Sequence, residues 1–383
     1  GLIIAVLLSG TDQPDPVSSH LVYAASLGGS GLGCVVAVVV LDRLGGEGTI
    51  AMAAAVAMAA AAGFATLLPM RRFAALGIGA TVLLVVMGVS VPGPLDMNLS
   101  PYKGLAAALR FPGAEVVATG WDRGSRIDLV SSDGIRSLPG LSFSYAGAPP
   151  LQDGVTFDGD DLSPIPRGAA ENAEYAAHLL TSLPWLLRPG ADALVLEPRG
   201  GLDVQIALSG GAESVTAVEP HGSVVGLTRR GGSSLYDDGR VGLVVGDPRT
   251  YVERTEARFD VVDLALTSPY RPVTSGAYSL AEDYSLTVEA IVAYLERLQP
   301  NGILMVARWV QTPPSEEMRL LATAVSALRQ TGVVPEPTVV MLRNYSNTVL
   351  LAQPDGWSDG DIDAVRDFAA AERFDIIAMP GVD

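Results

Sequence analysis

The stretch LVLEPRGGLD, residues 194–203, decides the fold of the second half of the chain. It completes a short apolar run at 193–197 of the kind that forms a buried strand. Gly200 and Gly201 follow, and glycines allow a tight turn and a close approach of the backbone. A helix is predicted to begin near Asp203. This order of strand, glycine turn and helix is typical of a doubly wound sheet, where ligands bind beyond the carboxyl ends of the strands.

The sequence after this stretch keeps alternating between short apolar runs and helical segments. Such alternation predicts a parallel sheet, because parallel neighbours need a crossover connection. Two runs separated by Tyr345 and Ser346 instead predict an antiparallel hairpin at the sheet edge. We therefore expect a Rossmann-like, doubly wound α/β domain over 169–383 with a terminal β-hairpin. Strands are expected at 214–219, 240–247, 259–266, 302–309, 338–344 and 347–353, and helices at 170–187, 283–298 and 358–371.

Residues 95–168 have a different texture, rich in Gly, Pro and short β-prone pieces. The pieces are AEVVATG, RIDLVSS, LSFSYAG and DGVTFDG. Their spacing predicts a small antiparallel β unit built from hairpins.

The first 94 residues are strongly apolar, and the whole chain has a mean hydropathy of +0.33. Uncharged stretches at 21–41, 49–68 and 73–91 have the length that a helix needs to cross a bilayer. They lack the polar stripe that soluble helices carry, so transmembrane helices are favoured over core helices. Because the chain begins with Gly1 inside an apolar run, we expect a truncated N-terminus with further spans upstream.

The formal net charge is −17, which argues against nucleic acid as a partner and is compatible with a cationic substrate or with ordinary solubility. The single cysteine, Cys34, falls within a predicted span, and the three histidines are scattered along the sequence. This spacing predicts no metal site.

Carboxylates stand at three successive strand ends, at Glu197, Glu219 and Asp247. An acid 22 residues beyond the first strand end can accept hydrogen bonds from ribose hydroxyls. Asp247 is placed to receive an adenine amino group. Each carboxylate could alone be a helix cap or a solvated loop residue, but together they predict a nucleoside site.

The span from about 100 to 380 resembles the spermidine synthase superfamily of class I S-adenosylmethionine-fold transferases, and in particular its bacterial multi-pass membrane branch. The resemblance is carried by SPYKGL, PPLQDGVTFDGD, LVLEPRGGLD, VTAVEP, GDPRTYV and YSLAEDYSLTVEAIVAYLERLQPNGILMVARW. It implies that S-adenosylmethionine or decarboxylated S-adenosylmethionine is held by Gly200, Gly201, Glu219 and Asp247, with Glu197 beside them. Since such cofactors are made in the cytosol, it also implies a bacterial inner-membrane protein with a cytoplasmic catalytic domain. A homodimer is a further possibility that the family suggests.

The chain departs from this family at the strand that ends in FDVVDLALTSPY, residues 259–270. Aligned without gaps, the two aspartates that hold and deprotonate the amine in polyamine synthases fall on Ala265 and Ser268. Asp263 could replace them as a base, or it could be a structural carboxylate bonded to the backbone. With Ser268 and Tyr270 it completes the set of candidate catalytic residues. Three further candidates resemble the family's substrate-gate region, namely Asp158, Asp160 and Tyr175.

These features favour a membrane-anchored transferase that moves a methyl or an aminopropyl group to an unknown small acceptor, either an amine or a lipid-like molecule. Alignment of nucleophile, carbon and leaving sulfur could suffice if the acceptor is already nucleophilic. Two alternatives stay open. One is a polyamine synthase proper, and the other is a catalytically silent nucleoside-binding domain that serves as a sensor or scaffold.

Overall fold

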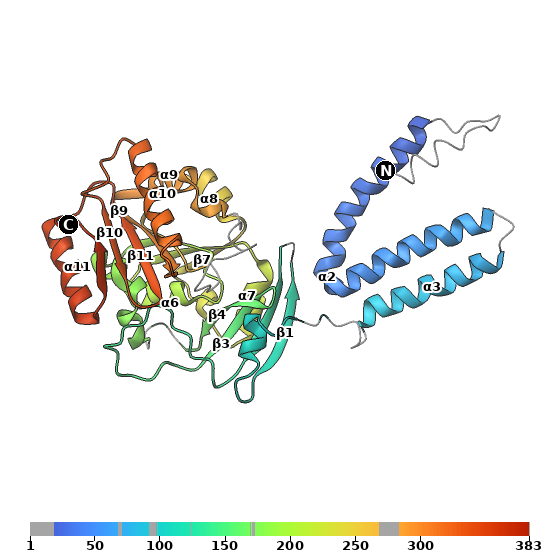
Figure 1. Cartoon of the computed structure of the whole chain (residues 1–383), viewed down its shortest axis with the longest axis horizontal. Helices are drawn as coiled ribbons and strands as arrows, with labels where there is room; N and C mark the ends of the chain where they lie inside the picture. Colours follow the sequence, from blue (N-terminus) through green and yellow to red (C-terminus); the bar gives the residue numbers. More distant parts are fainter. Residues whose placement is uncertain are drawn as a thin grey trace. The chain divides into compact units, whose positions relative to one another are not determined.

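The chain forms two compact units, residues 1–98 with 121–124 and residues 99–120 with 125–383. The computed structural model describes residues 19–67, 71–91, 97, 99–122, 124–168, 170, 173–267 and 283–382. Figure 1 shows the elements of each unit and their order along the chain.

The N-terminal unit consists of two long apolar helices, α2 (Ser19–Leu67) and α3 (Arg71–Ser90). Both are long and apolar enough to cross a membrane. At 1.5 Å per residue the 49 residues of α2 would extend about 70 Å, roughly twice the hydrocarbon thickness of a bilayer. Gly45, with φ 71° and ψ −176°, breaks α2 into two helical halves, as Figure 1 shows. The first two predicted spans fall on either side of this break, and the third falls in α3.

Small residues let α2 and α3 pack closely. A Cβ on Gly48 would lie 2.7 Å from the carbonyl oxygen of Gly88, and a Cβ on Gly77 would lie 2.8 Å from the Cβ of Ala62. Contacts this close exclude any side chain larger than hydrogen, which is the packing that membrane helices use when no hydrophobic force holds them together.

The C-terminal unit begins with a four-stranded sheet in the order β1-β2-β3-β4. Its strands are β1 (Glu115–Trp121), β2 (Arg126–Ser131), β3 (Gln152–Phe157) and β4 (Asp160–Pro166). The antiparallel pairing of β2, β3 and β4 agrees with the predicted β unit. The prediction of a strand over 141–147 is wrong. Those residues form turns, because the Ser142 hydroxyl accepts the Ser144 N–H at 2.8 Å and offers the backbone a partner outside any sheet.

An eight-stranded mixed sheet forms the body of the unit, in the order β12-β10-β11-β9-β8-β5-β6-β7. Strands β5 to β9 run parallel, whereas β10, β11 and β12 pair in antiparallel fashion. The predicted Rossmann-like fold and its terminal hairpin are therefore confirmed. The strands are β5 (Asp192–Leu196), β6 (Ser214–Glu219), β7 (Val241–Val245), β8 (Phe259–Leu264), β9 (Leu298–Trp309), β10 (Val339–Arg343), β11 (Asn347–Ala352) and β12 (Asp375–Ala378).

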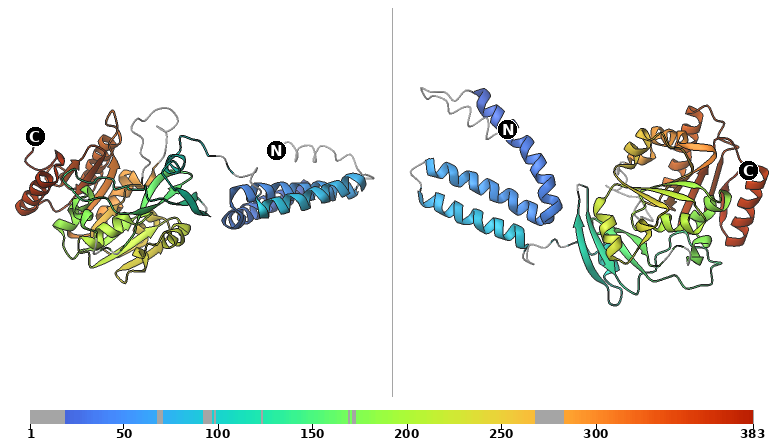
Figure 2. Two further views of the ribbon diagram at one scale, coloured as in Figure 1. Left: turned by 90° about the horizontal axis from the view of Figure 1, so that it is seen from below. Right: turned by 180° about the vertical axis from the view of Figure 1, so that it is seen from behind.

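Helices cover both faces of this sheet, and alternate residues of each strand belong to different apolar clusters. One face packs against α5 (Leu183–Leu187), α6 (Leu202–Ser209) and α11 (Asp359–Glu372). The other packs against α9 (Val288–Glu296) and α10 (Glu316–Gln330). The C-terminal segment returns beside α11 in every view (Figures 1 and 2).

Two helix predictions need correction. The single helix expected over 170–187 is instead a series of short turns, η3 (Glu174–His178), η4 (Leu180–Ser182) and α5. Leu179 between them is extended, with φ −90° and ψ 144°. The helix expected over 283–298 is shorter, because its first turn is η7 (Tyr284–Leu286) and Thr287 then caps α9 by accepting the Ala290 N–H at 3.2 Å.

Candidate active site

The loop after β5 is unusually tight. Glu197, Arg199 and Gly201 have φ angles of 56°, 51° and 92°. Only the last of these is a glycine, and a left-handed backbone is costly for residues with a side chain. The loop therefore stores strain that its surroundings must hold, and strained loops of this kind cluster at functional sites.

Gly200 packs closely against the neighbouring sheet. A Cβ at this position would lie 2.1 Å from the carbonyl oxygen of Pro164 on β4. The N–H of Gly200 also points to β4, with the Ser163 hydroxyl at 3.4 Å. The glycine is thus required by the packing of β4 on this loop, and cofactor binding by Gly200 and Gly201 stays a prediction.

Glu219, at the end of β6, anchors the same loop. Its side chain is fully buried, Oε2 accepts the Arg199 N–H at 2.8 Å, and Oε1 accepts the His221 N–H at 2.9 Å. Burial raises the pKa of this carboxyl to about 7, although the two N–H groups favour the charged form. A ribose could reach Glu219 only after the Arg199 segment moved aside.

Asp247 lies on the surface, where its Oδ1 accepts the Thr250 N–H at 2.7 Å. It is the N-cap of α8 (Pro248–Arg254). Neither Asp247 nor Glu219 lines the small cavity beyond β5 and β8 or the larger groove beside it. Their predicted convergence on an adenosine stays a prediction.

The Arg199 side chain is turned onto the small sheet. Its guanidinium carbon lies 4.5 Å above the centre of the Phe157 ring on β3, within the range of a cation–π contact. Its carbonyl accepts the Tyr236 hydroxyl at 2.9 Å. Both ends of the residue therefore pin the loop.

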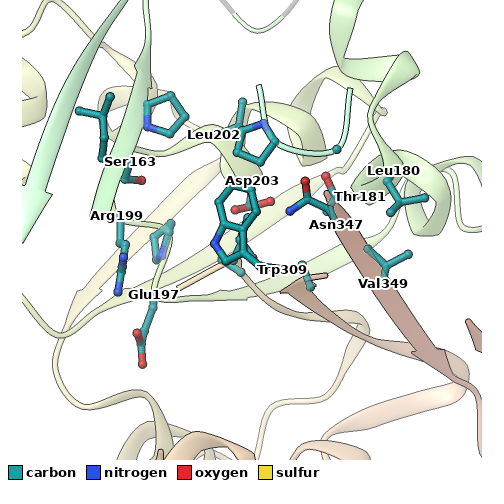
Figure 3. A pocket seen from close by; sticks show the side chains of 18 residues that line it. Ser163, Leu180, Thr181, Glu197, Arg199, Leu202, Asp203, Trp309, Asn347 and Val349 are labelled. Atoms are coloured by element: carbon teal, nitrogen blue, oxygen red, sulfur yellow. The ribbon is translucent and has the colours of Figure 1, made fainter. Parts of the chain in front are cut away.

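A cavity of about 40 Å³ lies beyond the carboxyl ends of β5 and β8. Figure 3 shows Asp203 and Trp309 in the middle of its lining, with Arg199 and Glu197 to one side and Thr181 and Asn347 to the other. A hollow of this size accommodates a small polar head group, and it is far below the roughly 300–1,000 Å³ of sites that hold whole small molecules.

Asp203, in the first turn of α6, lines this cavity, and Asp263, in β8, is a buried acid that feels the charge of Asp203. Asp263 is 1% exposed, and its Oδ1 has no hydrogen-bond partner among the described residues. Burial, reinforced by the charge of Asp203, raises the pKa of Asp263 well above the usual range. Burial likewise raises the pKa of Asp203 to about 6.

The position of Ala265 connects this pair to the predicted catalytic strand. Ala265 is buried and lines the cavity, and Asp263 lies on the same face of the sheet by strand alternation. Ser268 and Tyr270, the other candidate catalytic residues, lie outside the described residues.

Glu197 differs from this pair because cations surround it. Burial raises its pKa, but the positive charges of Arg199, Arg308 and His221 oppose that rise. Arg308 itself is 1% exposed, and its Nη2 lies 3.5 Å from Oδ2 of Asp283. The charge on Glu197 is therefore compensated within the protein.

A larger groove of about 860 Å³ adjoins the cavity and shares Leu162 and Trp309 with its lining. Aromatic side chains line much of it, including Tyr102, Phe143, Tyr145 and Tyr345. Its volume falls within the range of small-molecule sites. The groove is thus wide enough to bring a substrate to the mouth of the small cavity.

The three residues predicted to form a substrate gate have different surroundings. Asp160 lines the groove. Asp158 holds the β3–β4 turn, with its Oδ1 accepting the Arg126 N–H at 2.9 Å. Tyr175 is buried, and its hydroxyl donates to Gln205 in α6. In the part of the chain that the structure describes, no cluster of three or more His, Cys, Asp or Glu could hold a metal ion.

The strand order and the parallel pairing of β5 to β9 define a Rossmann-like α/β domain. No family model matches the chain. The chain is 28% identical over 165 residues to polyamine aminopropyltransferase 1 of Pseudomonas aeruginosa, covering 41% of this chain and 54% of that protein. It is 33% identical over 121 residues to the polyamine aminopropyltransferase of Thermoplasma volcanium, covering 30% and 44%.

Solved structures give a similar but weaker match. Spermidine synthase from Thermotoga maritima matches with a TM-score of 0.42 and 19% identity, over 66% of this chain and 78% of that one. A probable spermidine synthase from Corynebacterium glutamicum matches with a TM-score of 0.46 and 15% identity, over 67% and 87%. No residue role is transferred from them.

The resemblance to the spermidine synthase superfamily is thus confirmed by the curated relatives, although the chain spans only about half of their length. Its membrane branch stays a prediction. Sequence reasoning did not select Asp203 as a site residue. The available signal was an acid two residues after the glycine turn, which equally fits a favourable first-turn helix residue.

Proposed function

We propose that the chain is an aminopropyltransferase-type enzyme that uses decarboxylated S-adenosylmethionine and an amine acceptor. The observation that carries this proposal is the sequence similarity to two polyamine aminopropyltransferases. Buried carboxyls beside a cavity at the strand ends support it, because a negative, desolvated hollow favours a cationic ligand.

In the proposed reaction the acceptor nitrogen attacks the carbon bonded to the sulfonium sulfur. A C–N bond forms, the C–S bond breaks, its electron pair goes to sulfur, and methylthioadenosine leaves. The acceptor nitrogen must first lose a proton, or lose it as the bond forms. Alignment of nitrogen, carbon and sulfur supplies most of the rate for such a displacement. Methyl transfer from S-adenosylmethionine is the related alternative from the same class of donor.

The apolar helices α2 and α3 support membrane anchoring. We place the α/β unit in the cytoplasm, where donors of this class are made, and assign the protein to the bacterial inner membrane. Accessibility of a cysteine introduced at exposed Glu213 to a membrane-impermeant thiol reagent, in intact and in opened cells, tests this placement. Labelling in intact cells would contradict it.

A second candidate function is a catalytically silent sensor or scaffold. Two observations favour it: Ala265 stands where the family has an acid, and the Gly200 turn is filled by the Pro164 carbonyl. The two functions differ in turnover, because a silent domain binds a nucleoside without consuming it.

The test uses the full chain in detergent, incubated with decarboxylated S-adenosylmethionine and a panel of primary diamines. The proposal expects methylthioadenosine and an aminopropylated amine to form in equal amounts. Nucleoside binding by calorimetry without any turnover would support the silent domain. Absence of binding by decarboxylated S-adenosylmethionine, S-adenosylmethionine and methylthioadenosine would contradict both candidates.

A further inference from the structure

Asp263 is one of the buried charged side chains in the described part of the C-terminal unit that has an atom without a hydrogen-bond partner, and Asp203 is its acidic neighbour. Asp263 is almost wholly buried, and its Oδ1 has no hydrogen-bond partner there. An orphaned buried carboxyl oxygen costs free energy, so native proteins normally supply a partner from the protein, a water or a ligand. Here the protein supplies none to Oδ1, whereas it supplies both oxygens of Glu219 with backbone N–H groups.

The pair has access to an opening. Asp203 and Ala265 line the 40 Å³ cavity, and Asp263 lies on the same sheet face as Ala265. A carboxylate side chain at 265, as in the family pattern, would add an acid to the lining of this hollow. With alanine there, Asp203 reaches the hollow from α6, and Asp263 is buried one step deeper on the same strand. Asp203 therefore supplies an acid at the cavity wall, with Asp263 buried near it.

The surroundings of the pair favour a cation. Tyr236 in η5 (Leu235–Asp237) is a further titratable group near Asp203, and its pKa rises through burial and the charges of Glu219 and Asp203. Glu197 and Arg199 also line the cavity, and the Arg199 guanidinium stacks on Phe157. The cavity lining thus carries two acids and one cation, and that cation is engaged with an aromatic ring.

We propose that Asp203 and Asp263 together bind a primary ammonium group in this cavity, and so replace the acids that the family places at 265 and 268. This inference rests on the proposed function and specifies how that function handles its amine. The cavity fits an ammonium with its first methylene groups, while the adjoining groove of about 860 Å³ holds the remainder of the molecule. Thr181 and Asn347 on the opposite wall offer oxygens for the remaining ammonium hydrogens.

The ammonium could belong to the acceptor amine or to the aminopropyl chain of the donor. The test is calorimetry of the full chain in detergent with putrescine, decarboxylated S-adenosylmethionine and methylthioadenosine, which is a nucleoside without an ammonium. Asp203→Asn and Asp263→Asn keep the shape of each side chain and remove its charge. Asp367→Asn, on an exposed position of α11, is the matched control.

If the pair binds the acceptor, both variants weaken putrescine by about tenfold or more and leave the two nucleosides within about threefold. If it binds the donor, they weaken decarboxylated S-adenosylmethionine by the same factor and leave methylthioadenosine unchanged. Either result supports the inference. Equal weakening of all three ligands, or no weakening of any, would overturn it.

The same titrations separate this inference from the proposed function. If the wild type binds nucleosides and the variants bind every ligand as the control does, the role of the pair is contradicted and the proposed function is not. If putrescine binding depends on Asp263 but no nucleoside binds, the ammonium site is supported and the transferase function is contradicted. Failure of the wild type to bind any of the three probes contradicts both.

Discussion

Glu219 and Asp263 are both buried acids on neighbouring parts of one sheet, yet the protein treats them differently. Glu219 accepts two backbone N–H groups, at 2.8 and 2.9 Å, and thereby holds the loop after β5. Asp263 has an oxygen without a partner and another acid, Asp203, as its charged neighbour. Burial alone therefore does not identify a carboxyl that binds a ligand. A buried carboxyl oxygen without a hydrogen-bond partner is the better indicator.

The largest expected effect is the pH dependence of the free energy of unfolding, which tests how Glu219 and Asp203 are held in the folded state. Folding raises the pKa of Glu219 from 4.5 to about 7 and that of Asp203 from 3.8 to about 6. Because the folded state resists ionisation of both groups, their contribution to the free energy of unfolding is highest below about pH 4 and falls until about pH 7. The two shifts together correspond to a fall on the order of 6 kcal/mol, measured by denaturant titration in detergent. Stability that rises over this window would contradict the assignment.

Replacing the satisfied acid should destabilise the fold. Glu219→Ala leaves the N–H groups of Arg199 and His221 without acceptors, so the free energy of unfolding should fall by about 3 kcal/mol. The measurement belongs near pH 5.5, where the wild-type carboxyl is mostly protonated and its charge contributes little. Glu213→Ala, at the exposed position immediately before β6, should stay within about 0.5 kcal/mol. Similar free energies of unfolding for Glu219→Ala and Glu213→Ala would show that Glu219 does not stabilise the loop after β5.

Replacing the unsatisfied acid should have the opposite sign. Asp263→Asn removes a buried charge from beside Asp203, and we expect the free energy of unfolding at pH 8 to rise by about 1 kcal/mol. Thermal unfolding of the ligand-free chain, compared with Asp367→Asn, measures this. A loss of stability as large as that of Glu219→Ala would place Asp263 among the structural carboxyls.

Asp247 should give the smallest effect. Asp247→Ala removes the N-cap of α8 and should cost about 1 kcal/mol, whereas Asp247→Ser keeps a capping oxygen and should cost a few tenths. Methylthioadenosine affinity in the serine variant then separates the two roles of this residue. If the serine variant is as stable as the wild type but binds methylthioadenosine weakly, Asp247 is assigned to adenine binding. If the variant binds with wild-type affinity, Asp247 is only a helix cap.

The sheet could be predicted from the sequence because its strands are short apolar runs whose period needs no tertiary information. The run at 214–219 has the bounds that β6 shows in the structure. The helix expected over 170–187 failed because local propensity gave way to packing: Tyr175 is tied to Gln205 of α6, and Leu179 is extended between two turns. The acids at strand ends could be located, but not their partners.

The Asp203–Asp263 pair shows why. Its members are 60 positions apart in the sequence, and they meet only because α6 packs on the face of β8 that carries alternate residues. The sequence offered Asp263 as either a base or a backbone-bonded carboxyl, and only the fold shows which of its oxygens lacks a partner. Similarly, one of the two backbone groups that Glu219 accepts, the Arg199 N–H, comes from a turn whose left-handed residues include Glu197 and Arg199, which no residue preference predicts.

Proton release on amine binding tests the central claim most directly. A pair that holds a proton near neutral pH must give it up when an ammonium stabilises its charged form. Calorimetry of putrescine and of decarboxylated S-adenosylmethionine at about pH 6.5, in two buffers of different ionisation enthalpy, counts the protons released. We expect a measurable release from the wild-type chain with one of the two ligands, and its loss in Asp263→Asn. Heats that do not depend on the buffer, or a release that survives in the variant, would contradict this account.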